Sequence, residues 1–118
     1  MNSALERIDL LHALYEAFNN RDVDRCLAAM TPDVDWENGW EGGRVIGREA
    51  VREYWERQWA AIHSFAEPTA IAARSDDTFE VAVHLLVRDG AGNAVSEADA
   101  VHVYEFRGDL VERMTIES

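Results

Sequence analysis

Two kinds of side chain in this sequence could support chemistry on an organic ligand. One is the amide of Asn38, which lies between Trp36 and Trp40 in an otherwise acidic segment, residues 33–41. An uncharged hydrogen-bonding group between two large aromatic side chains is typical of the wall of a ligand pocket. The other is the imidazole of His102, since imidazole is the side chain best suited to proton transfer near pH 7.

Further aromatic residues are expected to complete this pocket. Trp55 and Trp59 are one helical turn apart, and Tyr104 falls on the same strand face as His102. Plain core packing is the better interpretation for any one of the tryptophans outside the loop. Trp40 lies in a Gly-rich loop, so it is the best candidate for a mobile cap over a ligand.

The sequence predicts no metal, cofactor or nucleotide site. His84 shares the expected strand face of His102, but two strand repeats separate them, too far for both to bind one metal at about 2 Å. His12 and His63 have no ligand spacing, and Cys26 is expected to be a small buried residue without a histidine partner. No Gly-rich loop that follows a strand and opens a helix has the phosphate-binding spacing.

Composition predicts one globular domain over residues 1–118, with 47% hydrophobic residues. The formal net charge of −12 argues against nucleic acid or an anionic membrane as a partner. No N-terminal apolar run resembles a signal peptide, and no segment approaches the roughly 20 apolar residues of a membrane span. A single cysteine excludes an internal disulfide. The default expectation is a soluble, cytoplasmic protein.

Apolar spacing predicts three helices in the N-terminal half. The first should span residues 3–18 and open with a capping box of Ser3 and Glu6. Asp22 is expected to cap a second, shorter helix. The third should span residues 48–63.

Two short strands should precede the third helix and four longer strands should follow it, bounded by turn signals. The expected strands are Val34–Asn38, Val45–Ile46, Thr69–Arg74, Phe79–Arg88, Val95–Arg107 and Leu110–Ile116. Consecutive hairpins imply antiparallel pairing. The order of elements predicts an α+β fold in which helices cover one face of a curved antiparallel sheet.

Four segments, in order, resemble SnoaL-like members of the nuclear transport factor 2-like superfamily. They are Ala17–Asp22, Met30–Trp36, Gly47–Tyr54 and His102–Val111. The resemblance implies a cone-shaped α+β barrel, a fold that also houses ketosteroid isomerases. It implies little about the reaction, because this fold hosts enzymes, ligand binders and assembly modules.

At the matching positions the isomerase machinery is not preserved. The general-base aspartate falls on Asn38, and the protonated aspartate of the oxyanion hole falls on His102. The oxyanion-hole tyrosine falls near Leu14, with Tyr15 one step away and expected to point about 100° aside.

The resemblance leaves Asn38 to orient a carbonyl or hydroxyl group and His102 to move a proton. It therefore implies a small-molecule-binding protein, as a cofactor-free cyclase, isomerase or hydratase acting on an aromatic or alicyclic carbonyl compound. A non-catalytic ligand-binding or accessory module on the same fold is the alternative.

Strand alternation allows a competing interpretation of His102. The strands carry an apolar set (Val81, Val83, Val101, Val103, Met114, Ile116) and a polar set (Glu80, His84, His102, Tyr104, Arg113, Thr115). Burial of the apolar set would leave His102 outside, whereas the resemblance puts it inside the cone. Both fit if the polar set lines a cavity and the apolar set packs across a homodimer interface, and a bulge could also change the register. Hairpin counting places Glu80 opposite His102, with residues 113–115 across the next hairpin.

Overall fold

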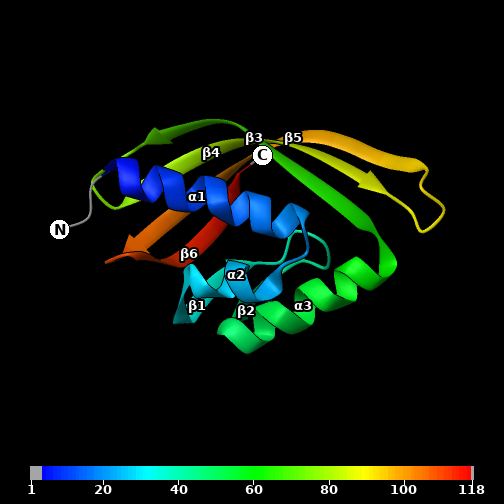
Figure 1. Cartoon of the computed structure of the whole chain (residues 1–118), viewed down its shortest axis with the longest axis horizontal. Helices are drawn as coiled ribbons and strands as arrows, with labels where there is room; N and C mark the ends of the chain where they lie inside the picture. The colour runs from blue at the N-terminus through cyan, green and yellow to red at the C-terminus, as the bar shows by residue number, and fades with distance from the viewer. Residues whose placement is uncertain (1–3, 118) are drawn as a thin grey trace.

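The computed structural model describes residues 4–117, and within this range the chain forms three helices and six strands (Figure 1). The helices are α1 (Ala4–Asn19), α2 (Val23–Ala28) and α3 (Arg48–Ala61). The strands are β1 (Met30–Glu37), β2 (Arg44–Ile46), β3 (His63–Ala73), β4 (Thr78–Arg88), β5 (Ala94–Arg107) and β6 (Leu110–Glu117). The predicted α+β class, with the helices in the N-terminal half, is confirmed.

Local sequence accounts for the start of α2. The carboxylate of Asp22 accepts a hydrogen bond from the backbone N–H of Arg25 at 3.3 Å, which is the predicted cap. The capping box expected at the first helix depends on Ser3, which lies outside the described residues.

All six strands form one sheet in the order β2-β1-β6-β5-β4-β3. Neighbours are antiparallel except β1 and β6, which pair in parallel. β3 begins at His63 rather than at the predicted Thr69, and its register shifts between Pro68 and Ala70. A proline lacks the N–H that a regular ladder needs, so a strand tolerates it at such an irregularity.

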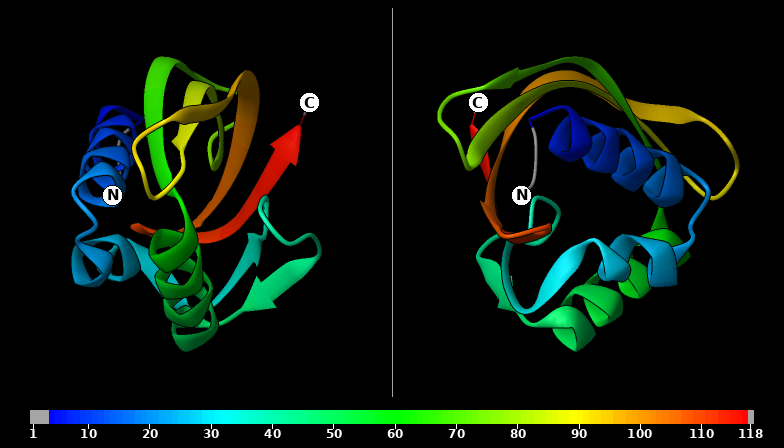
Figure 2. Two further views of the ribbon diagram at one scale, coloured as in Figure 1. Left: turned by 90° about the vertical axis from the view of Figure 1, so that its right-hand side faces the viewer. Right: turned by 60° about the vertical axis from the view of Figure 1, so that its left-hand side comes forward.

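The sheet is strongly curved, and the helices cover its concave side (Figure 2). α1 contacts β3 across this concave side, and α3 contacts β1, β2 and β3. α2 connects the two longer helices by contacts with both. The result is the cone expected from the resemblance, with its interior between helices and sheet.

A β-bulge in the β4–β5 hairpin sets the register of the long strands. Arg88 pairs with Ala94, whereas Val87 pairs with Ser96, so Val95 is an extra residue on β5. Counting back from Arg88 and Ala94 without the bulge would therefore pair each β4 residue with the wrong β5 residue, one position away from its true partner.

The predicted pairing of Glu80 with His102 is therefore wrong. Val81 lies opposite His102 on β4, and Ile116 lies opposite it on β6 instead of residues 113–115. A further register shift in the β5–β6 ladder, at Glu105–Phe106, accounts for the second difference. The sequence count failed because a bulge adds a residue without changing the hydrophobic pattern.

The predicted division of the strands into an apolar and a polar face is also wrong. Residues directly opposite each other share a face. Val81, Val83 and Met114 are accordingly buried on the inner face together with His102, whereas Val101 lies on the outer face. The sheet's inner face thus combines apolar and polar side chains.

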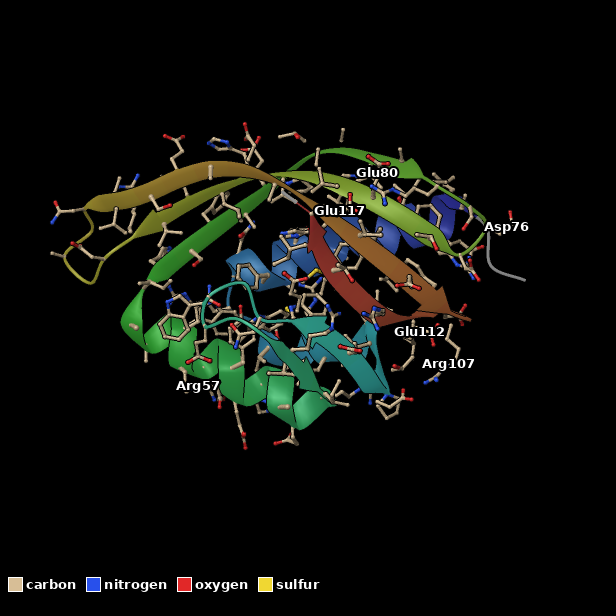
Figure 3. All side chains as sticks on the ribbon, turned by 180° about the vertical axis from the view of Figure 1, so that it is seen from behind. Arg57, Asp76, Glu80, Arg107, Glu112 and Glu117 are labelled. Atoms are coloured by element: carbon tan, nitrogen blue, oxygen red, sulfur yellow. The ribbon has the colours of Figure 1, made fainter. Side chains whose placement is uncertain are left out.

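The outer face of the sheet carries charged pairs, and Figure 3 shows Glu80 and Glu117 there. Arg74 joins these two carboxylates, from Nε to Glu80 at 3.0 Å and from Nη2 to Glu117 at 2.8 Å. Farther along β4, His84 Nδ1 lies 2.7 Å from the carboxylate of Asp99. The face that was expected to be apolar is therefore largely polar.

The entry into α3 depends on a glycine. Gly47 has φ 91°, in the region that L side chains rarely adopt, and its N–H donates to the carbonyl of Val34 at 2.7 Å. We expect Gly47→Ala to lower the free energy of unfolding by about 1–3 kcal/mol, because the new side chain strains a backbone that β1 holds in place. Urea unfolding of both proteins measures the difference.

Gly90→Ala is the matched control. An added Cβ at Gly90 meets nothing within 4 Å, and its φ is not positive. A loss of stability at Gly90 as large as at Gly47 would contradict the strain argument.

Candidate functional site

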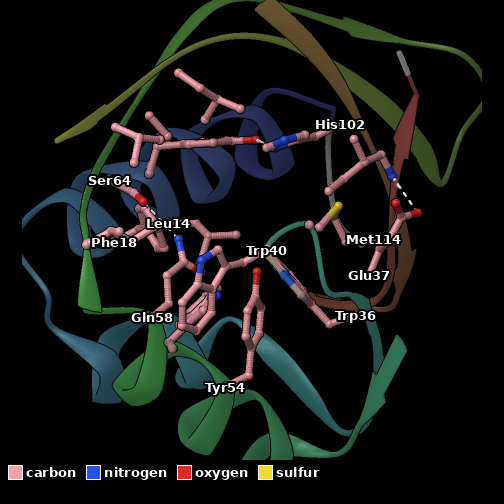
Figure 4. A pocket seen from close by; sticks show the side chains of 18 of the residues that line it. Leu14, Phe18, Trp36, Glu37, Trp40, Tyr54, Gln58, Ser64, His102 and Met114 are labelled. Atoms are coloured by element: carbon pink, nitrogen blue, oxygen red, sulfur yellow. Dashed lines mark hydrogen bonds between the residues drawn. The ribbon is translucent and has the colours of Figure 1, made fainter. Parts of the chain in front are cut away.

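A cavity of about 330 Å³ lies between the inner face of the sheet and the helices α1 and α3 (Figure 4). Its wall is mostly apolar. The aromatic side chains of the lining are Tyr15, Phe18, Trp36, Trp40, Tyr54, Trp55 and Tyr104. Its polar residues besides the tyrosines and tryptophans are Glu37, Gln58, Ser64 and His102. A space of this size, lined by aromatic rings and a few polar groups, is typical of sites for small organic ligands.

The aromatic wall is built from rings packed edge to face. Trp36 and Trp55 meet at 5.4 Å between ring centroids and 88°, and Phe18 meets Trp55 at 5.2 Å and 72°. Such pairs hold each other's orientation beyond simple burial. Trp59 is not among the lining residues; its ring lies 5.8 Å from that of Trp55 and 5.5 Å from that of Phe18, so it supports the wall from behind.

Three polar side chains form a hydrogen-bonded chain at one end of the cavity. The Tyr104 hydroxyl donates to the Tyr15 oxygen at 2.8 Å, and the Tyr15 oxygen lies 2.6 Å from His102 Nδ1. All three residues are buried. The chain joins α1 to β5, elements that are distant in the sequence.

Burial keeps each member of this chain uncharged. It lowers the pKa of His102 to about 4 and raises the pKa of Tyr15 and Tyr104 well above their ordinary value. At neutral pH the imidazole is therefore unprotonated and both phenols keep their hydrogens. Two arrangements satisfy the 2.6 Å contact: Tyr15 donates to Nδ1 and Nε2 carries the hydrogen, or Nδ1 donates to Tyr15 and Nε2 is a free base.

The prediction that Tyr15 points away from the site is wrong. Both Leu14 and Tyr15 line the cavity, and the Tyr15 hydroxyl reaches His102 and Tyr104 on β5. The sequence analysis missed Tyr15 because it assumed that only one of two adjacent helix residues could face the cavity. Of the predicted residues, Trp36, Trp40, Trp55, His102 and Tyr104 do line the cavity.

Asn38 is not among the residues that line the cavity. Its Oδ1 accepts from the backbone N–H groups of Trp40 at 3.1 Å and Glu41 at 2.7 Å, and its Nδ2 donates to the Glu41 carboxylate at 2.9 Å. Glu41 is in turn 2.8 Å from Arg57. Asn38 thus fixes the loop that carries Trp40, which is 38% exposed beside the cavity.

Gln58 and Ser64, which the sequence did not single out, form a second polar group in the lining. Gln58 Nε2 donates to Ser64 Oγ at 2.8 Å, and both residues are buried. Gln58 Oε1 is buried without a hydrogen-bond partner. Helical spacing predicts that Gln58 lies on or near the same stripe as Val51, Tyr54 and Trp55, but nothing in the sequence marked it as a site residue.

Glu37 is the carboxylate in the lining. It accepts from the backbone N–H of Ile116 at 3.0 Å and lies 3.5 Å from Arg44 Nη1. The carboxylate is thus held in the sheet at the edge of the cavity.

Within residues 4–117, no group of three His, Cys, Asp or Glu side chains could hold a metal ion. No helix in the same range is long and apolar enough to cross a membrane.

Comparison with known proteins identifies the family. The model of the SnoaL-like domain matches residues 11–114, so the chain belongs to the SnoaL-like family, as the resemblance implied. Among curated proteins, none has significant sequence similarity to the chain.

Solved structures with the same fold cover nearly the whole chain. TerC co-crystallized with polyporic acid matches with 23% identity and a TM-score of 0.83, over 95% of this chain and 90% of that one. A putative polyketide cyclase from Xanthomonas campestris matches with 24% identity and a TM-score of 0.80, over 95% and 89%. RV0760c from Mycobacterium tuberculosis in complex with estradiol-17beta-hemisuccinate matches with 20% identity and a TM-score of 0.83, over 96% and 93%. At these identities the likeness establishes the fold.

The buried imidazole predicts an acid-sensitive fold. An unfolded histidine titrates near pH 6.5, whereas His102 in the folded protein titrates at about 4. Between these values the unfolded chain binds more protons, so stability is lost as the pH falls from roughly 6.5 to 4. Between about pH 7.5 and pH 5, we expect the free energy of unfolding to fall by about 2 kcal/mol less in His102→Gln than in the wild type. Urea unfolding at the two pH values measures the difference.

His84→Gln is the control with the opposite sign. Hydrogen bonds to Asp99 and Glu97 raise the pKa of His84, so its stabilising contribution is complete at low pH and is lost as the pH rises. Its removal should steepen the acid loss. Equal pH profiles for wild type and His102→Gln would show that the imidazole is not kept neutral by burial.

Proposed function

We propose that this SnoaL-like protein binds a planar aromatic or alicyclic carbonyl compound in its cavity and enolises it without a cofactor. The hydrogen-bonded chain of Tyr104, Tyr15 and His102, at one end of a mostly apolar cavity, is the observation that carries the proposal. Enolisation is the first step of an isomerisation or an aldol-type cyclisation.

Tyr15 is the proposed donor to the ligand's carbonyl oxygen. When its oxygen accepts from Tyr104 and from His102 Nδ1–H, the Tyr15 hydrogen is free to point to the ligand. Negative charge that develops on the carbonyl oxygen is then stabilised by a donor already in place, in an apolar space where the hydrogen bond is stronger than in water.

His102 is the proposed base in the same arrangement. With Nδ1 protonated, Nε2 has a free lone pair and removes a proton from the carbon next to the carbonyl, which leaves an enolate and an imidazolium ion. A pKa of about 4 keeps the base unprotonated at neutral pH. The enolate beside it offsets the cost of a buried positive charge.

The surrounding rings suit a planar ligand. Trp36, Trp55 and Phe18 give fixed apolar surfaces, and the exposed Trp40 is proposed to cover the bound ligand. The ligands in the TerC and RV0760c structures, polyporic acid and estradiol-17beta-hemisuccinate, support a site for ring compounds on this fold.

The second candidate is a non-catalytic binding module on the same fold. It is favoured by Asn38, an amide at the position where the resemblance puts the isomerase base, and by the weak basicity of His102. A direct contact of Asn38 with a substrate oxygen stays a prediction, because its side chain is engaged within the loop.

Exchange of carbon-bound hydrogen tests the enolisation without knowledge of the natural substrate. 2-Tetralone, a bicyclic ketone with one planar aromatic ring, is incubated with the protein in deuterium oxide, and loss of its α-proton signals is followed by NMR. We expect exchange above the buffer rate, and a fall of roughly 10²–10⁴ in the catalysed rate for His102→Gln, because the general base is removed.

His84→Gln controls for the loss of a histidine remote from the cavity and should exchange at the wild-type rate. Asn38→Ala should weaken the binding of 2-tetralone, because the loop that carries Trp40 is then no longer held in place. A lower exchange rate at saturating ketone would instead support a direct contact of Asn38 with the substrate. Calorimetric binding of 2-tetralone without any catalysed exchange would favour the binding module.

We also propose a homodimer formed through the outer face of the sheet. Phe65 is 44% exposed and pairs with Leu86 across β3 and β4, which leaves an apolar patch on a largely polar face. Sedimentation at micromolar concentration should give about twice the chain mass of 13.3 kDa, and Phe65→Lys should halve it. A single species of chain mass in the wild type would refute the dimer.

A cytoplasmic location stays a prediction.

A further inference from the structure

We infer that the Tyr54 hydroxyl determines ligand specificity by donating a hydrogen bond to a second oxygen of the ligand, an uncharged acceptor such as a ketone or an ether. The inference rests on the proposed function, because it concerns another part of the same ligand. Tyr54 lies on α3 and lines the cavity, and only 4% of the residue is exposed. Figure 4 shows its ring rising from α3 with the oxygen directed into the cavity.

The Tyr54 oxygen is open to this cavity. Within the described part of the chain, the buried side-chain atoms that lack a hydrogen-bond partner belong to Arg7, Thr31, Gln58 and Trp59. The Tyr54 oxygen is not one of these closed atoms, although no described residue accepts its hydrogen. It is therefore accessible, and the space that it borders is the cavity. Since buried donors are nearly always paired, a phenol hydrogen aimed into a cavity indicates a ligand acceptor.

The surroundings make this hydroxyl a donor to the ligand rather than an acceptor. Burial raises the pKa of Tyr54 to about 12, so the phenol keeps its hydrogen at neutral pH. The backbone N–H groups of Trp40 and Gly39 act on this pKa in the opposite direction, because their positive ends face the oxygen. A ligand donor would meet the same positive ends, whereas a ligand acceptor meets the phenol hydrogen.

A nearby carboxylate disfavours a negatively charged acceptor. Glu41 raises the pKa of Tyr54, and this effect exceeds the opposite effect of Arg57, which pairs with Glu41 at 2.8 Å. A ligand carboxylate at Tyr54 would meet the same repulsion, and it would also lose its hydration in a mostly apolar cavity. The group that fits is therefore a neutral ketone, ether or ester oxygen.

Tyr54 faces the cavity from a different wall than the hydrogen-bonded chain of the proposed reaction. It belongs to α3, whereas Tyr15 belongs to α1 and His102 to β5. Figure 4 shows Tyr54 on one side of the cavity and His102 on the other. The inferred ligand is a neutral compound with an enolisable ketone at one position and a second acceptor oxygen at another.

Methoxy-2-tetralones test the inference. The methoxy group is placed in turn at positions 5, 6, 7 and 8 of the aromatic ring, and each compound is compared with its ethyl counterpart, in which CH₂ replaces the oxygen. Isothermal titration calorimetry measures the affinities. For the wild type we expect one methoxy isomer to bind about tenfold more tightly than its ethyl counterpart, because it alone accepts from Tyr54.

Tyr54→Phe removes the hydroxyl and keeps the ring. It should abolish the methoxy preference, while the affinity for the ethyl compound changes by less than about twofold. The inference would be overturned by four isomers without a preference in the wild type. A preference that survives Tyr54→Phe, or equal weakening of both compounds, would also overturn it.

Asn38→Ala is the matched control for the loop beside Tyr54. It releases the segment that carries Trp40 but keeps the Tyr54 hydroxyl. The methoxy and ethyl compounds should therefore both bind more weakly, with the ratio of their affinities kept. Loss of the methoxy preference in Asn38→Ala as well would show that Tyr54 acts only by holding the loop, and would overturn the inference.

The same compounds distinguish this inference from the proposed function. His102→Gln should abolish α-proton exchange, with the methoxy preference kept. A methoxy preference that depends on Tyr54, together with exchange unaffected by His102→Gln, would refute the proposed enolisation alone. Exchange that depends on His102 without any methoxy preference would refute the Tyr54 inference alone. Failure of every ketone to bind the wild type would refute both.

Discussion

The cavity between the helices and the sheet has mostly apolar walls. A polar group buried in those walls is stable only when it is neutral and hydrogen-bonded, and this constraint governs the structure. Burial disfavours any charged form, which is why the pKa of His102 falls to about 4 while those of Tyr15 and Tyr104 rise. Neutral buried groups have to satisfy one another, and the Tyr104–Tyr15–His102 chain does so at 2.8 and 2.6 Å. Since Tyr15 belongs to α1 and the other two to β5, the contacts that satisfy these groups also hold the helix over the sheet.

Apart from the Glu37 carboxylate at the edge of the cavity, the charged side chains of the described residues lie outside this interior. Exposed pairs such as Arg74 with Glu117 and Arg57 with Glu41 border the sheet and the loop, and pairs of this kind contribute only about 0–1 kcal/mol each. The side chains that give the formal net charge of −12 thus lie largely at the surface, where water solvates them. The stability of the fold therefore depends chiefly on its apolar walls. The ring pairs around Trp55 hold one another's orientation in those walls.

Irregularities in the strands decide which side chains face the cavity. The extra residue at Val95 brings His102 opposite Val81 and so puts His102 on the inner face of the sheet. Pro68 occupies the corresponding irregularity in β3, and Ser64 lies on the portion of β3 before it. A strand of uniform register would keep the two-residue alternation along its whole length, whereas a bulge adds twist and re-aims the residues beyond it. His102, at one polar end of the cavity, thus lies on a strand segment that a bulge has reoriented.

The sequence by itself determined the family, the α+β order of elements and the helix cap at Asp22. It also predicted an aromatic pocket, and Trp36, Trp55 and Tyr104 line the cavity of the structure. These follow from local spacing and from short ordered motifs, which are written directly in the chain. Only the tertiary structure decided the inward orientation of His102, the engagement of Asn38 within its own loop, the participation of Tyr15 and the pairing of Gln58 with Ser64. The physical reason is that one bulged residue reverses a strand's faces without altering its hydrophobicity. Contacts between residues 87 positions apart likewise depend on how a helix crosses a curved sheet, which no local pattern records.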